Sequence, residues 1–146
     1  MIGLLQRVSQ AAVNVDGQQV AAIRRGLLVL VGVQRGDGVA QAQRLAQRLL
    51  AYRVFADAQG RMNRSLTDLG GGLLLVPQFT LAADTGSGNR ASFTAAAEPA
   101  RARELFDELV AAARRGHPQV ASGLFGADMQ VVLVNDGPVT FWLEAH

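Results

Sequence analysis

The side chains that most often carry enzyme chemistry are scarce in this sequence. The chain has no cysteine and only two histidines, His117 beside a proline and His146 at the last position. Neither belongs to a cluster with metal-ligand spacing, and we expect structural or solvated roles for both. A Ser-His-Asp triad would need one of them, so a triad is disfavoured. The sequence predicts chemistry without a metal ion or a thiolate nucleophile.

Three glycine-rich segments resemble phosphate-binding loops only in composition. They are Gly70–Gly72, Gly86–Asn89 and Gly123–Gly126. The first and third precede predicted strands rather than helices, and the second lacks a third glycine. The chain also has no lysine for a Walker motif. We interpret all three segments as turns and expect no cofactor.

Two short segments remain as candidate sites. Gln78-Phe79-Thr80 follows a buried apolar run, and Asn135-Asp136-Gly137-Pro138 has the composition of a tight turn. Taken alone, the second segment equally suits a plain hairpin turn. A cis bond at Gly137-Pro138 does not follow from the residues, because only about 5–6% of X–Pro bonds are cis.

The strands that must position these segments follow from the apolar spacing. Alternating or continuous apolar residues predict β structure at residues 8–15, 20–23, 27–33, 54–55, 73–76, 129–134 and 139–143. The segment Asn135–Pro138 would join the last two strands. Gly60–Gly72 is polar and rich in glycine, so we expect it to be mostly loop.

Two segments with helical spacing of apolar residues predict helices. The first covers residues 39–50, with Asp37 as its expected N-cap. The second begins at Pro99 and ends at Gly116. The arginines in its last turn interact favourably with the helix dipole, and that role alone explains them. Two helices against many strands at hairpin-like spacing predict an α+β fold.

Length and composition indicate how these elements are organised and in which compartment the protein acts. The 146 residues fit a single domain, and a 49% hydrophobic content is enough for a core. The longest apolar run, Gly26–Val33, is far shorter than the roughly 20 residues of a membrane span. With no basic leader, we expect a cytoplasmic protein. A formal net charge of +2 permits RNA binding without demanding it.

Together, the two candidate segments resemble the signature motifs of the D-aminoacyl-tRNA deacylase family. The motifs correspond to Gln78–Leu81 and Asn135–Thr140. Further matches follow in the family's order along the whole chain, at Gln6–Ser9, Gly26–Leu30, Arg61–Asn63, Gly88–Arg90, Ser92-Phe93, Phe125–Val131 and Phe141–Leu143. The resemblance implies an α+β fold with a mostly antiparallel, barrel-like sheet. It also implies a homodimer with active sites at the subunit interface.

The resemblance implies a hydrolase that proofreads charged tRNA. Its substrates would be D-aminoacyl-tRNA and glycine misattached to alanine tRNA, and it would use neither metal nor cofactor. The ribose 2′-OH would assist hydrolysis, while Gln78 and the backbone N–H groups around Phe79 stabilise the oxyanion. Thr80 is the candidate side-chain nucleophile, and a positioning role is its alternative.

The resemblance also implies how substrates are selected. Gly137 and Pro138 of one subunit, joined by a cis bond, would enter the partner's pocket and reject L side chains by a clash with backbone carbonyls. Arg7 would brace the partner's Gly-Pro carbonyl. Phe125 and Gly126 would hold the terminal adenine. A further residue, Met129, would line the pocket or belong to the core.

One departure from the family and two alternatives stay open. Pro77 stands where the family has serine, and proline lacks both a hydroxyl and a backbone N–H, which leaves strict rejection of L-alanine open. One alternative is editing of an L-amino acid, as in the related archaeal threonyl-tRNA synthetase editing domain. The other is a non-catalytic dimer that binds RNA or another ligand. The sequence leaves the preferred amino acid and tRNA open.

Overall fold

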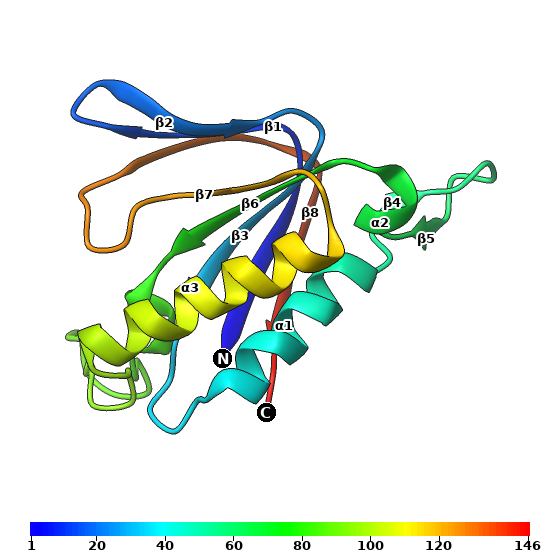
Figure 1. Ribbon diagram of the computed structural model, residues 1–146. Helices are drawn as coiled ribbons and strands as arrows, with labels where there is room; N and C mark the ends of the chain where they lie inside the picture. Colours follow the sequence, from blue (N-terminus) through cyan, green and yellow to red (C-terminus); the bar gives the residue numbers. More distant parts are fainter.

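The computed structural model describes all residues from 1 to 146 and is built on one curled sheet with two long helices against one face (Figure 1). The sheet has the order β2-β1-β3-β6-β7, and β8 pairs with β1. Its strands are β1 (Ile2–Val15), β2 (Gln18–Ile23), β3 (Gly26–Gly32), β6 (Gly72–Pro77), β7 (Val120–Ser122) and β8 (Gln130–Glu144). The pairs of β1 with β2, β3 and β8 are antiparallel, whereas β3, β6 and β7 run parallel.

The remaining elements lie around this sheet. They are α1 (Val39–Ala51), β4 (Phe55–Ala56), β5 (Met62–Arg64), α2 (Leu66–Leu69), the 3₁₀ helix η1 (Phe79–Ala82) and α3 (Pro99–Gly116). The two long helices, α1 and α3, lie side by side over the sheet (Figure 1). The predicted helices and the α+β class are therefore confirmed. No helix is both long enough and apolar enough to cross a membrane.

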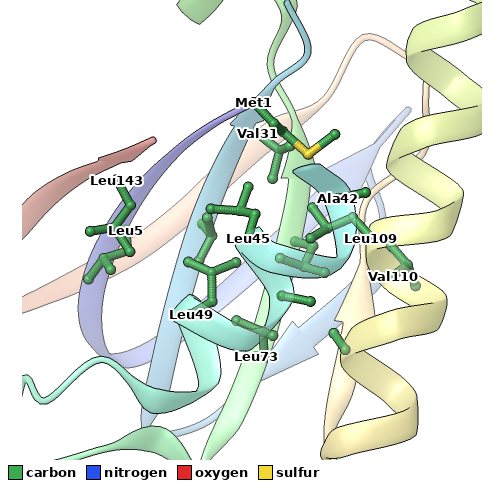
Figure 2. Close-up of a cluster of buried hydrophobic side chains, with 14 of the residues drawn as sticks. Met1, Leu5, Val31, Ala42, Leu45, Leu49, Leu73, Leu109, Val110 and Leu143 are labelled. Atoms are coloured by element: carbon green, nitrogen blue, oxygen red, sulfur yellow. The ribbon is translucent and has the colours of Figure 1, made fainter. Parts of the chain in front are cut away.

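The main core lies between the helices and the sheet. Figure 2 shows Leu45 and Leu49 of α1 and Leu109 of α3 packed in the layer that also holds Leu5 of β1 and Leu73 of β6. All five side chains are fully buried. The helical spacing of the apolar residues thus matches the faces of α1 and α3 that the sheet covers.

A second apolar cluster covers the opposite face of the sheet. In β3, Leu28 belongs to this cluster while its neighbours Leu27 and Val29 belong to the main core. The sheet curls so that β2 faces β6 and β7, which closes this second layer. Burial on both faces explains why β3 reads as an uninterrupted apolar run in the sequence.

The N-cap expected for α1 is wrong. The cap is Gly38, whose N–H donates to Oε1 of Gln41 at 2.9 Å. The carboxylate of Asp37 instead accepts the Gln34 N–H at 2.7 Å and the N-terminal ammonium of Met1 at 2.7 Å. A partner so distant in the sequence cannot be read from local capping patterns.

The segment Gly60–Gly72 has more regular structure than expected. It contains β5, which pairs with β4, and the short helix α2. The hydroxyl of Ser65 accepts the Asp68 N–H at 3.1 Å, and Asp68 Oδ2 accepts the Ser65 N–H at 2.9 Å. This reciprocal pair is a capping box, a local signal present in the sequence that the prediction of a loop overlooked.

The last two predicted strands form one continuous strand, β8. Both halves run antiparallel to β1, with Val8 opposite Asn135 and Gln6 opposite Thr140. The segment between Asn135 and Thr140 therefore bulges out opposite the single residue Arg7. A hairpin turn at this segment is wrong, since a hairpin would pair the two halves with each other.

Candidate active site

A cavity of about 490 Å³ opens where β6 ends, beside the start of α3 and the loop that precedes β8. It is lined by Val76, Pro77, Gln78, Phe79, Ala97, Pro99, Ala102, Phe125, Gly126, Ala127, Asp128, Met129 and Val131. Its size and largely apolar lining are typical of small-molecule sites. We call it the candidate pocket. It brings the first signature motif together with the segment expected to hold an adenine.

Gln78 and Thr80 are linked at the edge of this pocket. The Gln78 N–H donates to the Val31 carbonyl at 2.7 Å, and Gln78 Nε2 donates to Thr80 Oγ1 at 2.5 Å. Thr80 is exposed, and no carboxylate or imidazole accepts its proton. This geometry supplies no general base for Thr80 and favours its positioning role.

The backbone at the start of η1 offers hydrogen-bond donors. As the first residues of this helix, Phe79 and Thr80 have N–H groups without a partner inside it. The Phe79 side chain is 59% exposed, and its ring centroid lies 5.2 Å from that of Phe93. Phe93 lies in one of the family matches along the sequence, but its contact with Phe79 does not follow from the sequence.

Another part of the pocket is formed around Phe125. The Arg103 guanidinium lies 4.9 Å from the centroid of its ring, and the Phe106 ring packs at 6.4 Å. Gly126 has a φ of +78°, a conformation that favours glycine. Met129 lines the pocket and also packs against the second core cluster.

Pro77 also lines the pocket, as the last residue of β6. It pairs with Val31 of β3, and the next N–H in the chain, that of Gln78, donates to the Val31 carbonyl. Proline removes one backbone donor from this wall but leaves the strand pairing intact.

The second signature motif lies outside the candidate pocket of its own chain. The Gly137-Pro138 peptide bond is cis, both residues are exposed, and neither lines the cavity. The side chain of Asn135 closes the bulge around them. Its Oδ1 accepts the Val139 N–H at 3.1 Å, and its Nδ2 donates to Thr140 Oγ1 at 2.9 Å.

Arg7 connects this bulge to the segment that follows α1 through two hydrogen bonds. Its Nε donates to the Asp136 carbonyl at 2.9 Å, and its Nη1 donates to the Val54 carbonyl at 2.7 Å. Within one chain, Arg7 thus holds the carbonyl directly before Gly137. The expected contact of Arg7 with the partner's Gly-Pro carbonyl stays a prediction.

The histidines take no part in this site. His117 is buried and its Nε2 lies 2.6 Å from the Gly71 carbonyl, a structural contact between α3 and the sheet, while His146 is exposed. No group of three His, Asp or Glu side chains comes together in a way that could hold a metal ion. Hydrolysis without a metal stays a prediction.

The chain was compared with protein families and with known proteins. The family model described as D-Tyr-tRNA(Tyr) deacylase matches residues 4–144. A D-aminoacyl-tRNA deacylase of Thioalkalivibrio sulfidiphilus is 68% identical over 99% of this chain and 97% of its own length. A D-aminoacyl-tRNA deacylase of Methylococcus capsulatus is 64% identical over 99% of this chain and 94% of its own length.

Two solved structures share the fold of this chain. The chain superposes with a TM-score of 0.96 on a protein described as the c-Myc DNA unwinding element binding protein, at 35% identity over 100% of this chain and 99% of the other. A probable eukaryotic D-amino acid tRNA deacylase shares the fold, with a TM-score of 0.81 at 19% identity over 98% of both chains. The resemblance drawn from the motifs is confirmed, and with it the enzyme class, a hydrolase of carboxylic ester bonds. The chain belongs to the D-Tyr-tRNA(Tyr) deacylase family.

Proposed function

We propose that this protein hydrolyses the ester bond between a D-amino acid and the terminal ribose of tRNA. One observation carries the proposal: a single pocket joins the Gln78-Phe79 motif to Phe125 and Gly126. The relatives named as D-aminoacyl-tRNA deacylases support the substrate class. Charged tRNA is a cytoplasmic molecule, so we expect the protein to act in the cytoplasm.

Different parts of the pocket would bind the adenine and stabilise the oxyanion. The terminal adenine lies against Phe125 and Gly126, which places the ester carbonyl near the free N–H groups of Phe79 and Thr80. Water adds to the carbonyl carbon, and these N–H groups stabilise the oxyanion. The bond to the ribose oxygen then breaks, and that oxygen takes the proton that the attacking water gives up. The neighbouring 2′-OH assists the proton transfer, so no side-chain base is needed.

Stereochemical selection needs a second copy of the chain. Gly137 and Pro138 are exposed and away from their own pocket, so we infer that they enter the pocket of a partner in a homodimer. Their backbone carbonyls would clash with an L side chain and leave room for a D side chain or for glycine. Glycine on alanine tRNA is therefore a second substrate.

The outer face of β8 supports the dimer. Val132, Val134 and Trp142 project from it and are 55%, 48% and 51% exposed. They lie on the same strand as the Gly137-Pro138 bulge and on both sides of it. An apolar patch around a projecting motif is what a self-complementary interface requires.

The test compares matched D-Tyr-tRNA and L-Tyr-tRNA, with chelator present throughout. We expect rapid loss of the D ester alone. Loss of both esters would contradict selection by Gly137 and Pro138. Pro77, which replaces the family's serine, would then be the first residue to test for a loss of stereochemical selection. Loss of neither would overturn the proposed reaction, and a requirement for added metal would overturn the metal-free mechanism.

A second candidate function is nucleic-acid binding without hydrolysis. The 35%-identical structural neighbour described as a DNA unwinding element binding protein favours it. The two functions separate in one assay, because a binding protein would retain charged tRNA with its ester intact.

A further inference from the structure

The strongest unassigned feature is an open groove along α3. It has a volume of about 700 Å³ and is lined on one side by Arg103, Arg114 and Arg115 of α3 and on the other by Ser122–Phe125. We call it the arginine groove. Phe125 lines both this groove and the candidate pocket, so the two spaces adjoin.

The groove concentrates positive charge. It holds three arginines and one carboxylate, Asp107, an excess of two, and the formal net charge of the whole chain is also +2. Arg115 forms an ion pair with Glu108 at 3.0 Å. A hydrogen bond from the Gln43 amide and this contact with Arg115 hold the pKa of Glu108 below its usual value. Neither Arg103 nor Arg114 forms an ion pair.

The helix dipole does not explain this arrangement. It favours arginines in the last turn of α3, where Arg114 and Arg115 lie, but it does not favour Arg103 near the other end. Arg103 and Arg114 are eleven positions apart, so they lie on the same face of the helix, about 16 Å apart along its axis. Arg103 is held at the border with the pocket by its contact with the Phe125 ring.

We propose that the arginine groove binds the phosphate backbone of the tRNA strand that leads to the terminal nucleotide. With that nucleoside in the candidate pocket, the preceding phosphates pass Phe125 and follow Arg103 and Arg114 along α3. A charged groove beside an aromatic side chain is the usual way to hold a single strand without reading its bases. This inference rests on the proposed function, because it takes the pocket as the site of the terminal nucleoside.

The test uses Arg114→Gln, with Arg101→Gln as the matched control. Both side chains are exposed on α3 and glutamine suits a helix, but Arg101 lies outside the groove and pairs with Glu104 at 2.8 Å. Binding of uncharged tRNA is measured as a function of salt concentration. We expect Arg114→Gln to weaken binding several-fold and to reduce the slope of log K against log salt by about 0.7. The control should match the wild type.

Two substrates separate this inference from the proposed function. For D-Tyr-tRNA, Arg114→Gln should raise KM with kcat unchanged. For the D-tyrosyl ester of adenosine, which has no phosphate, the variant should act like the wild type. If the wild type hydrolyses neither substrate, the proposed function fails. The tRNA-binding measurement then still tests whether the arginine groove binds the RNA backbone. Equal affinity and salt slope in Arg114→Gln and Arg101→Gln would overturn the inference.

Discussion

At the scale of single residues, the proposed site consists of backbone groups and a few polar side chains that hold them. Gln78 binds the Val31 carbonyl through its own N–H and the Thr80 hydroxyl through its amide. Arg7 and Asn135 hold the projecting bulge from its two sides. The chemistry expected of such a site is positioning and oxyanion stabilisation, and two substitutions test this view.

Thr80→Val should leave most of the activity. Valine keeps the shape of threonine but removes the hydroxyl that accepts from Gln78, so kcat for D-Tyr-tRNA should fall about tenfold or less, below the cost of losing one oxyanion donor. Single-turnover kinetics measure this, with Thr80→Ser as the control that keeps the hydroxyl. A loss approaching the roughly 10⁶-fold effect of removing a nucleophile would show instead that Thr80 attacks the ester.

Gly137→Ala should weaken discrimination between D and L substrates. The new Cβ would lie 2.8 Å from Val139 Cγ2 and 2.9 Å from Arg7 Nη2, at a φ of +134° that an alanine rarely adopts. The bulge must shift, so the D/L ratio of kcat/KM should fall. Gly17→Ala is the control, because Gly17 also has a positive φ but nothing within 4 Å of its Cβ position. An unchanged ratio in Gly137→Ala would refute the selector role of Gly137.

At the scale of elements, the pocket depends on how β6, η1 and α3 meet. Strand β6 is buried on both faces and ends at Pro77, so the chain leaves the sheet directly into η1 at the pocket wall. The connection through β4, β5 and α2 leads into the other end of β6. Phe55 and Leu66 anchor it in the main core, and the capping box of Ser65 and Asp68 adds local hydrogen bonds.

Ser65→Ala tests this local stabilisation. Ser65 is the N-cap of α2, and its loss should lower the free energy of unfolding by about 1 kcal/mol in denaturant titrations. Ser87→Ala, in an exposed loop, should change nothing. Equal stability of the two variants would contradict the cap.

The same cap predicts a pH dependence. Hydrogen bonds from the Ser65 backbone and side chain hold the pKa of Asp68 below its ordinary value of 3.8. Since the folded pKa is the lower one, the contribution of Asp68 is present above 3.8 and is lost as the pH falls through the lowered value. The stability difference between the wild type and Ser65→Ala should therefore shrink in acid.

At the scale of the whole molecule, one chain carries both parts of the proposed site but does not bring them together. The candidate pocket lies beside α3, whereas Gly137 and Pro138 project from β8. The exposed apolar residues on β8 lie around the projecting motif. A dimer through this face would supply each pocket with its selector.

Val134→Glu should disrupt that dimer. A charge in the centre of the apolar face would be buried without a partner, so sedimentation should show a folded monomer and deacylation should be lost. Val39→Glu is the control, because Val39 is also exposed but lies in the first turn of α1, where an acid is favourable. A monomeric Val134→Glu with full activity would contradict a site shared between subunits.

Local patterns in the sequence suffice to predict the elements that bury a face or a run of their own residues. Apolar periodicity predicted α1, α3, β3 and β6, because each buries a face or a run of its own residues. The two motifs, in order among the other family matches along the chain, indicated the family, while the absence of cysteine and lysine excluded thiolate chemistry and a Walker motif. The capping box at Ser65 was available in the same way but was missed.

Contacts between residues far apart in the chain become visible only in the three-dimensional structure. Asp37 binds the N-terminal ammonium rather than capping α1, and Arg7 on β1 faces the bulge that interrupts β8. Phe125 joins Gln78 in one pocket and adjoins the arginine groove. These contacts depend on strand register and on packing between segments far apart in the chain, which spacing within any one segment does not encode.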